Sequence, residues 1–334
     1  MDKEKIVNSI NKYGFCNIEP EPYLDIISDI LRMKKEKDII ILAHYYQKGE
    51  IQDIADYVGD SLALAQIAEK NNSKMILLAG VHFMAETVKI LTPEKKILIP
   101  DINAGCSLAD SCPPQKFKEF IDSHPNHTVI SYVNTTAEIK TLTDIVCTST
   151  NALQIIESLP KNEKIIFAPD KNLGNYIRSI SGRDMILWDG ACHVHEKFSV
   201  ERILELKKQY PKAKIIAHPE CERPVQIIAD HIGSTSSLLK FTIQDKANEF
   251  IVATESGIIH QMKKENPDKI FITAPPKDST CACNDCEYMK LISIKKIWAT
   301  LKYEMPEIIL SSEIIEKASY SIQRMLKISD KLGL

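Results

Sequence analysis

The sequence lacks the features that mark membrane, secreted and nucleic-acid-binding proteins. Its longest apolar run, residues 75–85, is too short to span a bilayer and contains His82. The first residues, Met1 to Ile6, lack the apolar core of a signal peptide. Neither sign of charge is in large excess, because 42 basic and 45 acidic residues leave a net charge of −3. We therefore expect a cytoplasmic protein with neither a membrane nor a nucleic acid as partner.

Flexible linkers are also lacking. The 334 residues include 11 glycines and 16 prolines, and no Gly/Ser-rich or Pro-rich stretch separates one part of the chain from another. Apolar residues make up 44% of the chain and charged residues 26%, which is typical of a folded globular protein. Because a chain of this length exceeds what one hydrophobic core usually organises, we expect several tightly packed modules.

One pattern occurs three times along the chain. Each time an apolar strand ends in polar residues, and a hydroxyl side chain follows the end of the strand at one constant spacing. The three pairs are His44 and Ser61, Tyr132 and Ser149, and His218 and Thr235. The offset between the first and second repeats is 132 − 44 = 88, and that between the second and third is 218 − 132 = 86. Such regular spacing indicates a repeated structural unit.

Each repeat alternates short apolar strands with helices. In the second repeat we predict strands at 129–133, 144–148, 164–168 and 185–188, and helices at 136–142, 151–159 and 173–180. Continuous apolar strands between helices indicate parallel pairing. The sequence therefore predicts an α/β fold of three homologous doubly wound modules, each a four-stranded parallel sheet with flanking helices, around a pseudo-threefold axis. We expect a helical segment at 1–36 and modules at 37–125, 126–211 and 212–334, the last including C-terminal helices.

Nine cysteines in a cytoplasmic chain indicate metal binding or catalysis more than disulfides. Cys106, Cys192 and the group Cys281, Cys283 and Cys286 follow the last strand of each repeat. If the modules surround an axis, one thiolate from each would converge there. Three cysteines suit a [4Fe-4S] cluster with one open iron, a Lewis acid, better than a closed zinc site. Alternatively, Cys106 and Cys192 are small buried side chains, and the C-x-C-x-x-C run is a zinc knuckle or a redox pair.

Spacing by itself points to one cysteine of that group as the third ligand. The separation between strand end and cysteine is 106 − 44 = 62 in the first repeat and 192 − 132 = 60 in the second. In the third repeat the separation from His218 is 281 − 218 = 63 for Cys281, and it is larger for Cys283 and Cys286. The spacing therefore favours Cys281.

The three hydroxyl residues, Ser61, Ser149 and Thr235, each stand where a loop turns into a helix. One interpretation is helix capping, for which serine and threonine are common. The other is that three helix amino ends, with exposed N–H groups and aligned dipoles, face one centre and bind carboxylate or phosphate. In that case the ligand is small and carries several negative charges.

Groups suited to proton transfer lie at the strand ends, where α/β proteins build their sites. They are His44, Tyr45, Tyr46, Tyr132, Asn134, His218 and Glu220. Glu220 is the strongest candidate for a general acid or base. His193, His195 and Glu196 follow Cys192, and we interpret them as groups that support the cysteine or cap a helix.

Eight segments carry a resemblance to a known family: AHYYQ at 43–47, GDSL at 59–62, AGCSLAD at 104–110, YVN at 132–134, CHVHE at 192–196, HPEC at 218–221, GSTS at 233–236 and CEYM at 286–289. Together they closely resemble the quinolinate synthase family, from about Ile39 to Leu301. The resemblance implies a three-module transferase with an oxygen-sensitive [4Fe-4S] cluster. Such enzymes condense iminosuccinate with dihydroxyacetone phosphate to quinolinate, the precursor of the NAD pyridine ring, and release phosphate and water. A functional link to the enzyme that supplies iminosuccinate is implied as well.

Carried over by position, the resemblance implies that Cys106, Cys192 and Cys286 hold the cluster, in place of the Cys281 that spacing favours. The implied iminosuccinate contacts are His44, Ser61, Tyr132, Val133, Asn134, Ser149, His218, Pro219, Glu220 and Thr235. As catalytic groups we expect Glu220, His218, Tyr46 and His44. Glu287 departs from the family pattern, because many relatives have proline at this position.

Two other classes of protein would share part of this pattern. A different [4Fe-4S] hydro-lyase acting on another small dicarboxylate would have the same cysteines and the same anion sites. A non-catalytic iron–sulfur sensor would have the cysteines but no need for polar strand ends in every module. Formation of quinolinate separates the first class from the family, and a response of the cluster to substrate excludes the second.

Overall fold

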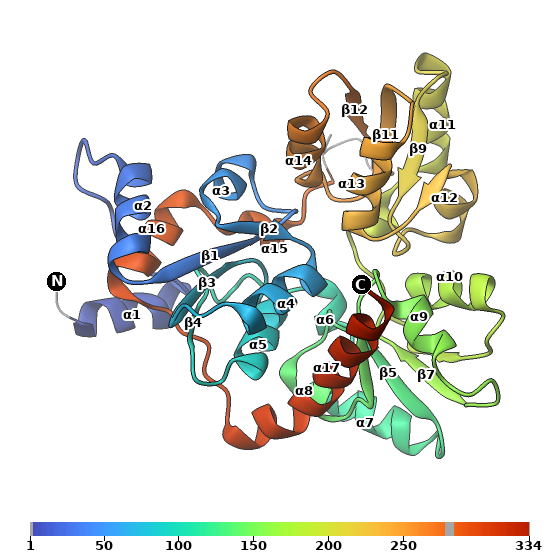
Figure 1. Ribbon diagram of the computed structural model, residues 1–334, viewed down its shortest axis with the longest axis horizontal. Helices are drawn as coiled ribbons and strands as arrows, with labels where there is room; N and C mark the ends of the chain where they lie inside the picture. Colours follow the sequence, from blue (N-terminus) through green and yellow to red (C-terminus); the bar gives the residue numbers. More distant parts are fainter. Residues whose placement is uncertain (1–2, 278–283, 334) are drawn as a thin grey trace. The chain divides into compact units, whose positions relative to one another are not determined.

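The computed structural model describes residues 3–277 and 284–333. Cys281 and Cys283 therefore lie outside the described residues. Three four-stranded sheets run through the described part of the chain, and all of their paired strands are parallel (Figure 1). In each sheet the first strand of the module lies between the second and the third, and the fourth lies at the edge. This common order confirms the predicted α/β fold of three homologous doubly wound modules.

The first module is completed by segments from both ends of the chain. It contains β1 (Ile39–His44), α3 (Gly49–Ile54), β2 (Tyr57–Gly59), α4 (Ser61–Lys70), β3 (Met75–Ala79), α5 (His82–Leu91) and β4 (Lys96–Leu98). Beside it lie α1 (Lys3–Tyr13), α2 (Ile26–Glu36), α15 (Glu287–Lys290) and α16 (Ile294–Tyr303). Ile6, Ile30 and Trp298 from three of these helices are buried in one core cluster with Ile41 of β1.

The second module matches the predicted order of elements. It contains α6 (Ser107–Asp110), α7 (Pro114–Asp122), β5 (Thr128–Tyr132), α8 (Ala137–Thr141), β6 (Ile145–Cys147), α9 (Ala152–Glu157), β7 (Ile165–Ala168), α10 (Lys171–Ser181) and β8 (Ile186–Leu187), followed by the 3-10 helix η1 (His195–Lys197). Every strand and helix predicted for this repeat is present, although β8 is very short.

The third module repeats the same layers. It contains α11 (Val200–Gln209), β9 (Lys214–Ala217), α12 (Arg223–Ile228), β10 (His231–Ile232), α13 (Thr235–Gln244), β11 (Glu249–Ala253), α14 (Ile258–Glu265) and β12 (Ile270–Thr273). In Figure 1, α11 and α12 lie on one side of this sheet and α13 and α14 on the other. The last helix, α17 (Ser312–Leu332), returns to the second module, where Ser321 Oγ donates to Lys140 O (3.0 Å) and Asn151 Nδ2 donates to Ser329 Oγ (2.9 Å).

Two compact units make up the chain. One consists of Met1–Cys106 with Glu287–Ser319, and the other of Ser107–Cys286 with Tyr320–Leu334. The first sheet belongs to the first unit, and the second and third sheets belong to the second unit. The module boundaries expected from the sequence and the pseudo-threefold axis stay predictions.

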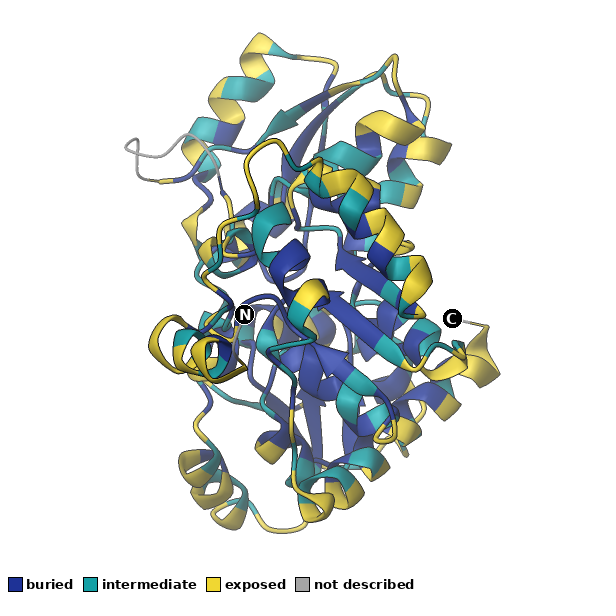
Figure 2. Ribbon diagram, turned by 90° about the vertical axis from the view of Figure 1, so that its left-hand side faces the viewer, coloured by how far each residue is buried: buried dark blue, intermediate teal, exposed yellow. Residues whose placement is uncertain are grey.

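The strands are apolar because helices cover both of their faces. Ile41, Leu42 and Ala43 of β1 are fully buried, as are Ile166 and Phe167 of β7. Figure 2 shows this division, with the strands in dark blue and the outward faces of the helices in yellow. None of the helices within the described residues combines the length and the apolar character needed to cross a membrane.

One aspartate in each module supports the first strand. Asp56, Asp144 and Asp230 each precede the short second strand, and their carboxylates accept the N–H of a residue 15 positions earlier, at 2.7, 2.8 and 2.8 Å. The donors are Ile41, Val129 and Ile215. Because the second strand begins only after the aspartate, the side chain takes the place of a ladder partner for this buried N–H. This repeated contact was not predicted from the sequence.

Candidate active site

The chemistry-bearing residues gather at the carboxyl ends of the central strands. Tyr132 is the last residue of β5, and His218 directly follows β9. Both belong to the second unit, in which a buried hydrogen-bonded group connects the second and third modules. This is the edge at which doubly wound sheets bind their ligands.

Glu220 lies at the centre of this group. Its Oε1 accepts a hydrogen bond from Tyr132 Oη (2.6 Å), and its Oε2 lies 3.0 Å from Nδ1 of His195. Nδ1 of His218 lies 3.6 Å from Oε1, and the exposed fraction of Glu220 is 3%. A carboxylate this deeply buried is stable only with such partners.

The surroundings keep Glu220 ionised. Burial raises the pKa of its carboxyl group, but the charges of His195 and His218 and the hydrogen bonds from His195 and Tyr132 outweigh burial and lower the pKa to about 2. The pKa of the nearby Asp170 is raised, mainly by burial and also by the negative charge of Glu220. At neutral pH Glu220 is therefore a negative partner for two imidazole rings.

His195 contacts both Glu220 and Cys192, whereas the sequence predicted only a group that supports the cysteine or caps a helix. Its Nε2 bonds to Thr254 Oγ1 (3.0 Å), its Nδ1 lies 3.2 Å from Cys192 Sγ, and its ring stacks on that of His218 with 4.8 Å between centroids. It thus connects Glu220 to a predicted cluster ligand. Its position three residues after Cys192 was visible in the sequence, whereas Thr254 carried no signal there.

The two strand-end histidines have the same tautomer in their neutral form. The N–H of Glu220 donates to His218 Nδ1 (3.3 Å), and the N–H of Tyr46 donates to His44 Nδ1 (3.1 Å). Since Nδ1 accepts in both cases, the proton of each neutral ring lies on Nε2. His218 Nε2 is 3.3 Å from Ser149 Oγ, so the second module supplies its hydroxyl partner.

At α4 and α13, the predicted hydroxyl residue is not the residue that caps the helix. Asp60 accepts from Ala63 N at the start of α4, and Ser234 accepts from Ser237 N at the start of α13. Ser61 and Thr235 are therefore the first helical residues, one position after the caps. Helix capping does not explain these two hydroxyls, and Thr235 is 3% exposed.

In each module, the loop after the first strand is held by a side chain eight residues after the strand end. These side chains are Gln52, Lys140 and Gln226, which follow His44, Tyr132 and His218 (52 − 44, 140 − 132 and 226 − 218). Gln52 Nε2 donates to Tyr45 O and Gln47 O, and Gln226 Nε2 donates to Pro219 O and Cys221 O. In the second module the donor is a fully buried lysine. Lys140 Nζ donates to Val133 O (3.0 Å) and Thr135 O, on either side of Asn134. None of these three donors was predicted from the sequence.

Burial divides the seven described cysteines into two groups. Cys16, Cys112, Cys147 and Cys221 are buried. Burial raises the pKa of their thiols, to about 11 for Cys16 and about 12 for Cys112. Cys106, Cys192 and Cys286 are partly exposed, and they are the three that the family resemblance assigns to the cluster. Partly exposed thiols on loops at the edge of a site are suitable soft ligands for iron–sulfur clusters.

The same region could also bind a single metal ion. Ligand atoms of Cys192, His195 and Glu220 all lie within 4.8 Å of one another. Cysteine, histidine and carboxylate are a donor set that zinc accepts. The chemistry of the donors alone therefore agrees with a metal centre here.

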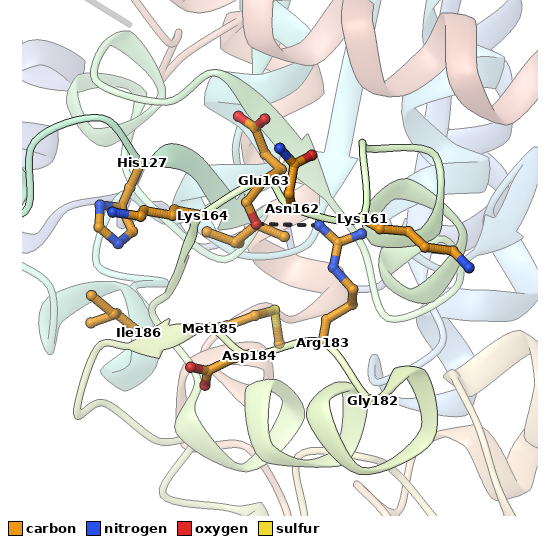
Figure 3. Close-up of a pocket in the computed structure, with 11 residues that line it drawn as sticks. His127, Lys161, Asn162, Glu163, Lys164, Gly182, Arg183, Asp184, Met185 and Ile186 are labelled. Carbon is orange, nitrogen blue, oxygen red and sulfur yellow. Dashed lines mark hydrogen bonds between the residues drawn. The ribbon is translucent and has the colours of Figure 1, made fainter.

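One hollow on the surface is not part of this site. It has a volume of about 390 Å³ and lies at the opposite ends of β7 and β8, beside Lys164 and Met185. Figure 3 shows Arg183 inside it, directed at the carbonyl of Glu163. Its guanidinium also donates to Ile156 O, Leu159 O and Pro160 O, so its hydrogen-bonding capacity is used within the fold.

The structure brings together part of the predicted site. Tyr132, Ser149, Cys192, His218 and Glu220 lie in one connected group in the second unit, with Val133 and Asn134 on the loop that Lys140 holds. Pro219, Thr235 and Cys286 also belong to the second unit, whereas His44, Tyr46, Ser61 and Cys106 lie in the first unit. There Lys290 Nζ donates to Tyr46 O (2.7 Å), and the rings of His44 and Tyr46 meet edge to face at 4.5 Å. Convergence of the two sets stays a prediction.

Comparison with known proteins identifies the family. Residues 28–327 match the family model described as "Quinolinate synthetase A protein". The chain is 52% identical over 318 residues to the quinolinate synthase of Chloroherpeton thalassium, covering 94% of this chain and 99% of that protein. It is 55% identical over 305 residues to that of a Synechocystis species, covering 91% and 96%. The chain therefore belongs to the quinolinate synthetase A family.

Proposed function

We propose that this chain is a quinolinate synthase of NAD biosynthesis, a transferase that condenses iminosuccinate with dihydroxyacetone phosphate to quinolinate and releases phosphate and water. The observation that carries the proposal is the buried group of Tyr132, His195, His218 and Glu220 at the carboxyl ends of β5 and β9. Such a condensation needs repeated proton transfers, and the group supplies connected donors and acceptors for them.

Both proposed substrates are small anions, which suits the donors at the strand ends. Tyr132, Ser149 and Asn134 offer hydroxyl and amide groups, and Ser61 and Thr235 stand at the amino ends of the helices α4 and α13. Helix dipoles and N–H groups at such ends favour carboxylate and phosphate. The proposed iminosuccinate contacts are His44, Ser61, Tyr132, Val133, Asn134, Ser149, His218, Pro219, Glu220 and Thr235.

The histidines are the proposed proton carriers, with Glu220 as their counter-charge. In its neutral form His218 holds a proton on Nε2 and can donate it to a substrate oxygen. When His195 or His218 takes up a proton, the ionised Glu220 stabilises the resulting imidazolium, as a buried carboxylate does in a catalytic triad. Tyr46 and His44 of the first module are proposed as further proton-transfer groups.

Cys106, Cys192 and Cys286 would hold a [4Fe-4S] cluster, whose iron without a cysteine ligand supplies a Lewis acid for the dehydration. Two contacts support this set of ligands. Ser107, which follows Cys106, is hydrogen bonded to His193, which follows Cys192. The ring of Tyr288, two residues after Cys286, lies against Gly105. A residue close to each proposed ligand therefore contacts a residue close to another proposed ligand.

The proposed location and partner follow from the chemistry of the substrates. Iminosuccinate is an imine, and imines hydrolyse in water. We propose that the protein acts in the cytoplasm and receives iminosuccinate from the enzyme that makes it. Neither a membrane nor a nucleic acid is part of this proposal.

Anaerobic purification followed by iron, sulfide and product analysis tests the proposed function. The expected protein is brown, contains iron and sulfide, and forms quinolinate only when both substrates are present. A protein that holds the cluster but acts on a different dicarboxylate would be another hydro-lyase. A change in the spectrum of the cluster when a substrate is added would exclude a non-catalytic sensor. A colourless protein with bound zinc would overturn the proposal entirely.

A further inference from the structure

Two buried carboxylates stand at the same place in the second and third modules. Asp170 follows β7 by two residues, and Glu255 follows β11 by two residues. Both side chains are fully buried, with exposed fractions of 0%. The first module has Val81 at this place, two residues after β3. The fold of a module therefore does not itself require a carboxylate here.

Each carboxylate uses one oxygen to hold the start of the next helix. Asp170 is the N-cap of α10 and accepts from Leu173 N at 2.7 Å. Glu255 accepts from Gly257 N, directly before α14, at 2.7 Å. These contacts satisfy N–H groups that a helix leaves without an internal partner.

The other oxygen holds a proposed cluster cysteine. Asp170 Oδ2 accepts from the N–H of Cys192 at 3.2 Å, and Glu255 Oε1 accepts from the N–H of Cys286 at 3.1 Å. In both modules the cysteine lies on the loop that follows the fourth strand. The same pair of contacts thus recurs, with aspartate in one module and glutamate in the other.

Additional contacts dock both loops beside these carboxylates. Lys171 N donates to Gly190 O (2.8 Å), and a Cβ at Gly190 would lie 2.5 Å from Pro169 O, so the chain approaches too closely for any larger residue. In the third module Ser256 Oγ donates to Asp285, the residue before Cys286. Residues Gly190 and Asp285, close to the two cysteines, are therefore held near the carboxylates.

We propose that Asp170 and Glu255 are positioning residues that fix the backbone of two cluster ligands, Cys192 and Cys286. The inference rests on the proposed function, because it needs the cluster. A loop outside the sheet orders its cysteine only through such contacts, and groups that orient ligands commonly change metal affinity by about 10- to 100-fold. The cysteine whose N–H Glu255 accepts is Cys286, the third ligand that the family resemblance implies.

The test replaces each carboxylate by its amide, in the variants Asp170→Asn and Glu255→Gln. Two N–H groups converge on each side chain, and an amide offers one acceptor oxygen, so one N–H must face the amide nitrogen. We expect iron loss to a chelator, followed under anaerobic conditions by absorbance, to be at least about tenfold faster in each variant. The spectrum of the reduced cluster should also change, which a purely structural defect remote from the ligands would not produce.

Two further variants separate ligand positioning from folding. Asp170→Ser keeps a residue that caps α10 but is too short to reach Cys192 as well, so it should lose the cluster faster while circular dichroism stays unchanged. Asp230→Ala removes a carboxylate of the third module that holds Ile215 N, outside the cysteine loops. It should lower stability without accelerating iron loss.

The outcomes distinguish this inference from the proposed function. A wild-type protein without an iron–sulfur cluster would overturn the proposed function and this inference together. If the wild-type protein holds the cluster and Asp170→Ser and Glu255→Gln hold it equally firmly, the inference alone is wrong. Iron loss from Asp230→Ala as fast as from Asp170→Asn would also overturn it, because the effect would then be one of general stability.

Discussion

Glu220 forms close contacts with the Tyr132 hydroxyl group and with two imidazole rings, yet it is almost completely buried. All three neighbours interact with the negative charge of its carboxylate. Replacing Glu220 by Gln keeps the size of the side chain but removes the counter-charge of His195 and His218. We expect the rate of quinolinate formation to fall about a hundredfold or more, the usual scale for a lost acid–base partner, while the absorbance of the cluster stays intact.

A matched control for this variant lies two residues away. Glu222 is on the same loop, but its side chain is 37% exposed and pairs with Lys277. Glu222→Gln should turn over like the wild type, because surface ion pairs contribute little. Unchanged turnover in Glu220→Gln would remove Glu220 from the mechanism.

The thiols offer a second test at the level of single residues. Alkylation proceeds through the thiolate, so a thiol whose pKa is raised from 9.0 to about 11, as in Cys16, should react about a hundredfold more slowly at pH 8. We expect iodoacetamide to modify Cys106, Cys192 and Cys286 after iron is removed by a chelator. Cys112 should remain unmodified until the protein is unfolded in urea. Mass spectrometry of the peptides reads out each site, and equally fast labelling of Cys112 and Cys192 would contradict the division.

Much of this site was visible in the sequence because it lies at strand ends. Tyr132, His218 and Glu220 follow apolar runs directly, and the constant spacing between strand end and hydroxyl pointed to Ser149. Asp170, Glu255 and Thr254 were missed because each looks like an ordinary residue after a third strand. Only the contacts of their side chains with residues distant in sequence, such as Cys192 and Cys286, show what they do.

At the scale of elements, Lys140 of α8 determines how the loop after β5 is held. Its fully buried ammonium group donates to carbonyls on both sides of Asn134. Replacing Lys140 by Met leaves the buried Thr135 O without this donor, at a cost of about 1–3 kcal/mol, whereas Val133 O keeps the N–H of Thr135 at 2.8 Å. We expect a lower urea midpoint and a KM for iminosuccinate raised about tenfold, because Asn134 is no longer held in place.

The other two modules suggest the rescuing variant. Gln52 and Gln226 hold the corresponding loops with an amide, so Lys140→Gln should recover most of the stability that Lys140→Met loses. If the positive charge also attracts the anionic substrate, KM will recover less than stability does. Equal stability of the Met variant and the wild type would show that the lysine does not hold the loop.

The sequence predicted the elements of each module better than the segments that complete it. Apolar periodicity located β5, β6 and β7 to within two residues, since buried parallel strands are continuous apolar runs. It could not show that α16 shares a core with α1 and α2, or that α17 returns to the second module. Those contacts join positions far apart in the chain, and short-range patterns do not record them.

For the whole molecule, the threefold repetition is itself a source of internal controls. The order of strands is the same in all three sheets, and each module has an aspartate that holds the N–H of its first strand at the same sequence separation. Because the same contact occurs in three modules, the loss of stability on removing it can be compared between three surroundings. The three aspartates are Asp56, Asp144 and Asp230.

Replacing each of these aspartates by Ala should destabilise the protein by about 1–3 kcal/mol, because a buried strand N–H loses its acceptor. The three losses should add within about 0.5 kcal/mol in the triple variant, since the sites lie in different sheets and share no partner. Asp56→Ala should cost slightly more, because Asp56 also pairs with Lys34 at 3.0 Å. Urea unfolding monitored by circular dichroism measures all four values. If only one of the three single variants is less stable than the wild type, the contact does not stabilise the other two modules.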